Sequence, residues 1–179
     1  MSDMTSENLG AALVACHDRA HAALEATFFG ALEALTALDL GRAVSQWETL
    51  MAATASHLDA EDAALLDLLD DAQAPPRGAS ARIVAPEHSR LGELLAAGQA
   101  ALGALHAFAE APGSPVRRVM VRRLEPLLRV HHLLTHHHVR ERELVYPFAA
   151  RRLTAAEAAR LMRVLEATTA ACEAAIAPI

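Results

Sequence analysis

Apolar residues recur every three to four positions along most of this chain of 179 residues, which is the period of an α-helix with one buried face. In the first such segment, residues 6–37, the apolar positions that share this face are Leu13, Ala20, Leu24, Phe28, Ala31 and Leu35. Asp39 is suited to cap a second helix over residues 40–71. Residues 72–80 include two prolines and a glycine, and this loop composition ends the second helix.

Prolines also divide the second half of the chain. Pro86 fits the first turn of a third helix, where its missing N–H costs nothing, and we expect this helix to run to about Glu110. The Ala-Pro-Gly sequence at residues 111–113 breaks it. The Ser-Pro pair at residues 114–115 then starts a fourth helix, which is predicted to end near the Tyr-Pro pair at residues 146–147.

Pro126 falls inside this fourth helix, so we expect a kink or a break there. A capping box formed by Thr154 and Glu157 starts a fifth, shorter helix that ends near residue 176. Four long helices followed by a short one predict an all-α protein, and an antiparallel up-down four-helix bundle is the natural packing.

The composition supports this interpretation. The chain contains 42 alanines, its 16 basic residues are all arginine, and only 3% of its residues are aromatic. We therefore expect residues 1–179 to form a single domain, with the bundle over about 6–150 and the C-terminal helix over about 154–176. The large side chains expected in the core are Trp47, Phe28 and Phe29.

The charge pattern excludes some functions. A formal net charge of −6 gives no general basic surface for nucleic acid. The most apolar stretch, residues 91–109, is no membrane span because polar residues interrupt it. Without an export signal at the start of the chain, we expect a cytoplasmic protein in which Cys16 and Cys172 are small buried side chains.

Ten histidines stand out, and two of them precede a glutamate by four residues: His57 with Glu61, and His137 with Glu141. Four residues make about one helical turn, so the imidazole and the carboxylate of each pair project from one face, which continues with apolar residues. A buried carboxylate is costly unless a positive charge holds it, and a metal ion supplies that charge while binding both groups. The alternative is a metal-free bundle with incidental histidines.

Chain lengths place further histidines at the same level of the bundle. His21 lies 17 residues before the first turn between helices, and His57 lies 18 residues beyond it. His88 and His137 are 24 and 25 residues from Pro112 in the second turn. The candidate metal ligands are therefore His21, His57, Glu61, His88, His137 and Glu141.

Six such ligands are too many for one tetrahedral zinc ion, and they suit two metal ions bridged by the glutamates, with water or oxo ligands in the remaining positions. Imidazole with carboxylate and without thiolate favours iron, with manganese next. His17 lies one turn from His21 and is an alternative or additional ligand. Tyr146 is expected in the core, with a place near the metals as the alternative. The candidate acceptors for the second ring nitrogens of the histidines are Asp18, Asp62 and Glu87.

Over about residues 10–150, the chain resembles the hemerythrin-like HHE cation-binding domains. The residues that carry this resemblance are His21, the pair His57 and Glu61, the adjacent Glu87 and His88, and the ending formed by His137, Glu141 and Pro147. The sequence departs from the family's pattern in two ways, because no proline follows Glu61 at the end of the second helix and because His17 is an extra candidate ligand.

The resemblance implies a four-helix bundle that holds two non-haem iron ions (Fe2+/Fe3+), with histidines as terminal ligands and two bridging carboxylates. We expect an oxo or hydroxo bridge beside Glu61 and Glu141, with manganese or zinc as the alternative metals. The implied activities are binding of O2 or NO, redox sensing, iron handling and protection from nitrosative or oxidative stress.

Two other functions stay open from the sequence. One is a di-iron enzyme that removes peroxide or NO, and the other is a metal-free structural or partner-binding bundle. We expect small ligands as partners, with neither nucleic acid nor membrane, and the sequence leaves a homodimer open.

Overall fold

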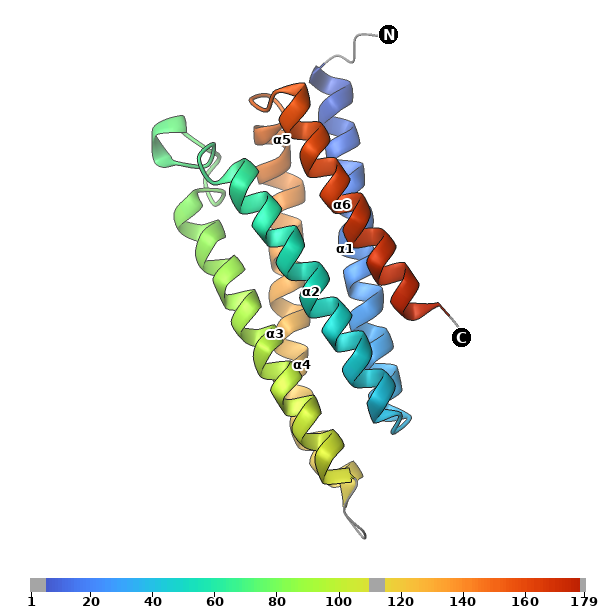
Figure 1. Cartoon of the computed structure of the whole chain (residues 1–179). Coiled ribbons are helices and arrows are strands. Elements are labelled where there is room, and N and C mark those ends of the chain that lie inside the picture. Colours follow the sequence, from blue (N-terminus) through green and yellow to red (C-terminus); the bar gives the residue numbers. More distant parts are fainter. Residues whose placement is uncertain (1–5, 110–114, 178–179) are drawn as a thin grey trace.

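The computed structural model of the protein describes residues 6–109 and 115–177, and within them every regular element is helical (Figure 1). The elements are α1 (Ser6–Thr36), α2 (Leu40–Leu65), η1 (Asp71–Gln73), α3 (Ala81–Ala109), α4 (Val116–Arg140), η2 (Glu141–Val145), α5 (Tyr146–Ala149) and α6 (Ala155–Ile176). The prediction of an all-α protein is confirmed. None of the described helices combines the length and the apolar character needed to cross a bilayer.

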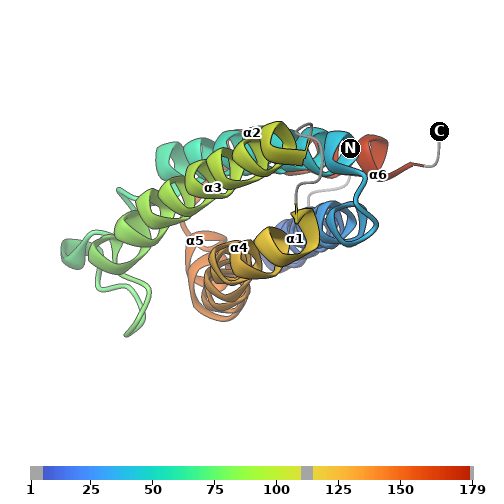
Figure 2. The same ribbon diagram turned by 90° about the horizontal axis from the view of Figure 1, so that it is seen from below.

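The long helices lie side by side in a bundle (Figures 1 and 2). Helix α1 packs against α2 and α6, while α3 packs against α2 and α4. Seen from below, α2 and α3 form one layer and α1 and α4 the other (Figure 2). Contacts between α1 and α4 are sparse by comparison, which leaves a seam between these two helices.

Two helix starts follow the predicted capping chemistry. The Asp39 side chain accepts a hydrogen bond of 3.1 Å from the backbone N–H of Arg42, in the first turn of α2. At the start of α6, the Thr154 hydroxyl accepts from the Glu157 N–H, and the Glu157 carboxylate accepts from the Thr154 N–H. Both caps satisfy backbone donors that the first helical turn leaves without partners. These two predictions are confirmed.

The prediction that the second helix continues to residue 71 is wrong, because α2 ends at Leu65. The chain turns after this residue and buries Leu69 completely in the core. The Asp70 side chain then accepts from the Ala72 N–H and starts the short helical turn η1 instead of extending α2. Burial of one leucine and a local cap therefore outweigh the helical pattern of these residues.

The third helix begins earlier than predicted, at Ala81, and Pro86 lies inside it. The Ser80 carbonyl accepts the first backbone hydrogen bonds, from Ile83 and Val84. Pro86 lacks an N–H, so it leaves only the carbonyl four residues before it, that of Arg82, without its helical donor. The predicted end at Glu110, the break at 111–113 and the start at Ser114 lie outside the described residues.

Neither proline of the fourth helix ends it. Of the kink or break predicted at Pro126, the break is absent, because helix α4 runs through this residue. The helical path also passes Pro147, where an end was predicted, and continues to Ala149 through the five-residue π-helical turn η2. Pro147 has no N–H to bond the Glu143 carbonyl, which removes one α-type hydrogen bond next to this wider turn.

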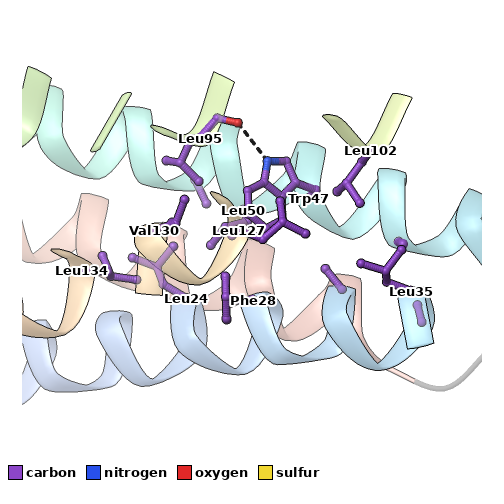
Figure 3. Close-up of a cluster of buried hydrophobic side chains, with 14 of the residues drawn as sticks. Leu24, Phe28, Leu35, Trp47, Leu50, Leu95, Leu102, Leu127, Val130 and Leu134 are labelled. Carbon is purple, nitrogen blue, oxygen red and sulfur yellow. Dashed lines mark hydrogen bonds between the residues drawn. The ribbon is translucent and has the colours of Figure 1, made fainter. Parts of the chain in front are cut away.

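Trp47 lies within one of two apolar clusters (Figure 3). It is fully buried, and its Nε1–H donates a hydrogen bond of 2.9 Å to the Leu95 carbonyl. Gly98 allows α3 to approach this ring, because a Cβ at position 98 would lie 2.1 Å from it. Phe28 is buried in the same cluster as predicted, but Phe29 is 42% exposed because adjacent helical residues point to different faces.

The second apolar cluster contains Leu13, Leu65 and Val145 and lies nearer the α5 end of the bundle. On each of the four helices α1 to α4, buried ionisable residues lie between members of the two clusters. On α3, for example, His88 lies between Val84 of one cluster and Leu91 of the other. The fold therefore places a polar layer between two apolar ones.

Candidate metal centre

This polar layer contains seven ionisable side chains from α1 to α4 and the adjoining turn η2, none of them more than 5% exposed. They are His17, His21, His57, Glu61, His88, His137 and Glu141. The structure brings together all six residues that the sequence predicted for one level of the bundle, and it adds His17. The hairpin lengths and the four-residue spacings were therefore sufficient to locate the layer.

Helical spacing positions the pairs within the layer. On α2, His57 Nε2 lies 3.1 Å from Glu61 Oε1, one turn later. On the continuous helical path of α4 and η2, His137 Nε2 lies 2.9 Å from Glu141 Oε1. Each pair projects from one face of its helix toward the bundle interior, as the four-residue spacing predicts.

Glu141 links the two halves of the layer. Possible ligand atoms of His17, His21, His57 and Glu141 all lie within 4.8 Å of one another. A second group with the same property consists of Glu61, His88, His137 and Glu141. Each group offers four nitrogen or oxygen ligands and could hold a metal ion, with Glu141 as the shared residue.

Carboxylates outside the layer orient two of its imidazoles. His88 Nδ1 lies 2.6 Å from Asp62 Oδ1, and His137 Nδ1 lies 3.2 Å from Glu87 Oε2. Arg140 in turn binds the Glu87 carboxylate through two hydrogen bonds of 2.9 and 3.1 Å. A proton held on Nδ1 leaves Nε2 of each ring with a free lone pair for a metal ion. Asp62 and Glu87 thus lie where the sequence analysis expected such acceptors.

Tyr146 contacts this site, which the sequence analysis gave as the alternative to simple core packing. Its hydroxyl donates a hydrogen bond of 2.6 Å to Glu61 Oε1, and its ring centroid lies 4.3 Å from that of His17. In an unbroken α-helix Tyr146 would point about 140° away from Glu141. The extra residue of the π turn reduces this angle to about 40°. Apart from Pro147, no feature of the sequence indicated that turn.

His17 is the other residue that the sequence left undecided. It is completely buried, and its Nε2 lies 2.9 Å from Glu141 Oε2, closer than the 3.4 Å that separates His21 Nε2 from the same oxygen. The two rings lie side by side on α1, with centroids 4.4 Å apart. The structure therefore supports both histidines in the layer and does not require one to replace the other.

Several atoms of the layer have no hydrogen-bond partner, which is costly for buried polar groups. The unpartnered atoms include Nε2 of His21, His57, His88 and His137, Oε2 of Glu61 and Oε1 of Glu141. Some of these atoms lie close together, but their directions do not allow hydrogen bonds between them. A group of buried nitrogen and oxygen atoms that have no hydrogen-bond partner among the described residues fits a metal site.

The pKa values show how the layer balances charge without a metal. Burial lowers the pKa of His137, but the charge of the nearby Glu141 carboxylate and the contact with Glu87 outweigh burial and raise it to about 10. Burial raises the pKa of Glu141, but His137, His17 and His21 outweigh burial and hold it well below its usual range. Protonated imidazole therefore stands in for a metal cation beside this carboxylate.

For His21 and Tyr146, unlike His137 and Glu141, burial decides the direction of the pKa shift. It lowers the pKa of His21 well below its usual value, so this imidazole is neutral and able to bind a metal at neutral pH. Burial and the charges of Glu61 and Glu141 raise the pKa of Tyr146 well above its usual value, so its hydroxyl keeps its proton as a hydrogen-bond donor. His21 and Tyr146 are thus both in the protonation state that metal binding requires, whereas His57, whose pKa the nearby Glu61 raises against the effect of burial, and His137 must give up a proton first.

Comparisons of the chain with models of protein families, with curated proteins and with solved structures found no match, so any assignment rests on the geometry of the layer itself.

Proposed function

We propose that this protein is a hemerythrin-like non-haem di-iron protein that binds O2 or NO and acts in redox sensing, stress protection or iron handling. The observation that carries the proposal is the sharing of Glu141 by two groups of buried ligands. A single-ion site needs no such overlap. Two ions held a few ångströms apart require bridging carboxylates, and a buried glutamate between two sets of histidines meets that requirement.

In this proposal each ion has its own histidines. His17, His21 and His57 would hold one ion, and His88 and His137 would hold the other. Both ions would share Glu141 and Glu61, because Glu61 Oε1 lies 3.1 Å from His57 Nε2 while its Oε2 lies 3.9 Å from His88 Nε2. An antiparallel four-helix bundle of α1 to α4, with α6 as an outer fifth helix, presents the ligands.

The donor set favours iron. Five imidazoles and two carboxylates provide nitrogen and oxygen atoms, and the layer contains no thiolate. With both glutamates shared, one ion would have five protein ligands and the other four, which together with water suits metals with five or six ligands better than two closed tetrahedral zinc sites. Iron in such a site supplies one-electron redox chemistry and an open position for a diatomic molecule.

The chain's own residues set the environment of that position. The apolar clusters above and below the layer exclude bulk water and keep the local dielectric constant low. Asp62 and Glu87 fix the orientation of His88 and His137, and Tyr146 holds Glu61. These contacts preorganise the ligands, so little rearrangement is needed when an ion binds.

Metal analysis and spectroscopy test the proposal. Purified protein is reconstituted with Fe2+ without oxygen, freed of excess metal, and then exposed to O2 or NO. We expect two irons per chain and new visible absorption bands on exposure. His137→Ala should abolish this response, whereas His132→Ala, at an exposed position of the same helix, should not. A wild-type chain that retains no iron, or that shows no spectral change with either gas, would overturn the proposal.

A further inference from the structure

The seam between α1 and α4 contains a small surface cavity of about 60 Å³. It is lined by His21, Glu25, His131, Leu134, Thr135 and His138. His21 belongs both to this cavity and to the buried layer, and it is only 3% exposed, with neither ring nitrogen hydrogen-bonded. The cavity therefore connects the surface with a candidate metal ligand.

The outer part of the cavity combines a carboxylate and an imidazole. Glu25 Oε1 lies 2.9 Å from His131 Nε2, and the Glu25 side chain is 51% exposed. The His131 ring lies against the rings of Phe28 and Phe29, with centroids 5.3 and 5.0 Å away. These contacts hold the imidazole in place beside Glu25. Carboxylate and imidazole are ligands that divalent transition-metal ions accept.

The inner part of the cavity continues this polar path. The His138 ring stacks on the His21 ring, with centroids 4.4 Å apart and planes inclined by 15°. His138 Nε2 lies 3.1 Å from Asp18 Oδ1. His17, Asp18 and His138 offer three ligand atoms within 4.8 Å of one another, so a third candidate cation group lies between the cavity and the buried layer.

We propose that this seam is the access route by which divalent metal ions reach the buried centre. Glu25 and His131 capture the ion at the surface, His138 and Asp18 hold it in passage, and His17 and His21 receive it. The cavity has room for a few water molecules, so an ion exchanges its hydration shell for protein ligands as it moves inward. This inference rests on the proposed metal centre, whose ligands are distinct from Glu25 and His131.

The charge of the cavity favours a cation over a neutral gas. The Glu25 carboxylate of the lining attracts a positive ion and gives a diatomic molecule no advantage. Asp18 adds a second carboxylate next to the lining residue His138, although Arg142 Nε lies 3.6 Å from it. The same seam is where contacts between neighbouring helices are sparse. An ion can thus enter without separating the densely packed pairs α1 with α2 and α3 with α4.

Metal uptake kinetics test the route with Co2+ as the probe, because its visible absorption changes when imidazole replaces water. The double variant Glu25→Gln with His131→Asn is mixed rapidly with Co2+ beside the wild type. We expect its uptake rate to fall roughly tenfold or more, as expected when a steering charge is removed. The final absorption spectrum and the amount of bound Co2+ should stay unchanged.

The matched control is Glu33→Gln with His132→Asn, which makes the same chemical changes at exposed positions of α1 and α4 outside the cavity. Its uptake rate should equal that of the wild type. Equal rates in all three proteins would overturn the access route while leaving the metal centre intact. A lower final amount of Co2+ in the Glu25 and His131 variant would also overturn it, because these residues would then be ligands. Failure of the wild type to bind any Co2+ or Fe2+ would instead contradict the proposed centre.

Discussion

The hydroxyl of Tyr146 donates a hydrogen bond of 2.6 Å to Oε1 of Glu61, and both residues are completely buried. The two side chains come from helices 85 positions apart in the sequence, and the π turn before Tyr146 is what aligns them. The bond leaves Oε2 of Glu61 without a partner inside the layer. Tyr146 therefore fixes the carboxylate, while Oε2 and a second lone pair of Oε1 stay available for metal ions.

Replacement of Tyr146 by phenylalanine tests this relationship. Tyr146→Phe keeps the ring and removes the donor to a buried carboxylate, so we expect the metal-free protein to lose about 1–3 kcal/mol of unfolding free energy. Urea denaturation measures this change. The loss should be smaller in the metal-loaded protein, because a bound cation also satisfies Glu61. Equal losses with and without metal would contradict a position of Glu61 beside the ions.

Glu141 should matter to both ions because two ligand groups share it. We expect Glu141→Gln to weaken binding at both positions, so that the dialysed protein retains less than one iron per chain. His88 belongs to one group only, and His88→Gln should therefore leave close to one iron bound. Elemental analysis after dialysis distinguishes these results. Identical stoichiometry in the two variants would show that Glu141 is not a bridge.

Asp62 provides a milder test because it contacts a candidate ligand and not the metal itself. Asp62→Asn removes the charged acceptor that orients His88, and we expect metal affinity to fall roughly 10- to 100-fold at unchanged stoichiometry. Competition with a chromophoric chelator measures the affinity. Asp59→Asn, at an exposed position of the same helix, serves as the control and should leave the affinity unchanged.

Packing of the fold can be tested away from the metal layer. Gly98→Ala places a methyl group against the Trp47 ring, and we expect a loss of about 1–3 kcal/mol in unfolding free energy from overpacking. Gly92→Ala on the same helix meets nothing within 4 Å and should raise stability by about 0.5–1 kcal/mol. Thermal denaturation of both variants checks the opposite signs, and a neutral Gly98→Ala would contradict the close approach of α3 to Trp47.

Much of this arrangement could be predicted because helical periodicity and hairpin length are local properties. His57 and Glu61 share a face by their spacing alone. The matched arms of the two hairpins bring His21 level with His57, and His88 level with His137. Capping residues such as Asp39 act on the nearest backbone groups. These features require no knowledge of tertiary contacts.

The sequence predictions failed where tertiary contacts determine the local structure. The pattern of residues 66–71 is helical, yet burial of Leu69 turns the chain there. Pro86 and Pro126 are tolerated inside helices because packing of the surrounding residues outweighs one lost hydrogen bond. Tyr146 reaches the layer only through a π turn that single-sequence periodicity does not reveal. His17 and His21 share one helical face, so spacing alone does not choose between them.

The charge balance of the layer predicts how stability depends on pH. The folded-state pKa of His137 is about 10, above its ordinary value of 6.5, so its stabilising contribution is complete below pH 6.5 and is lost as pH rises toward 10. The lowered pKa of Glu141 makes the opposite contribution, which is present above pH 4.5 and lost as pH falls below it. The lowered pKa of His21 also costs stability as pH falls below 6.5. The metal-free protein should therefore be most stable near pH 6.5.

Metal binding should abolish the loss of stability that the metal-free protein shows above pH 6.5. A metal ion requires neutral His137, so binding near pH 7.5 must release the proton that the metal-free protein holds there. Calorimetric titration with Fe2+ in buffers of different ionisation enthalpy counts the protons released. We expect wild-type protein to release more protons than His137→Gln. Between pH 6.5 and 8.5, the unfolding free energy of the wild type should fall when metal is absent and stay constant when metal is bound. A metal-free protein whose stability does not fall over this range would show that protonated His137 is not the cation that balances Glu141.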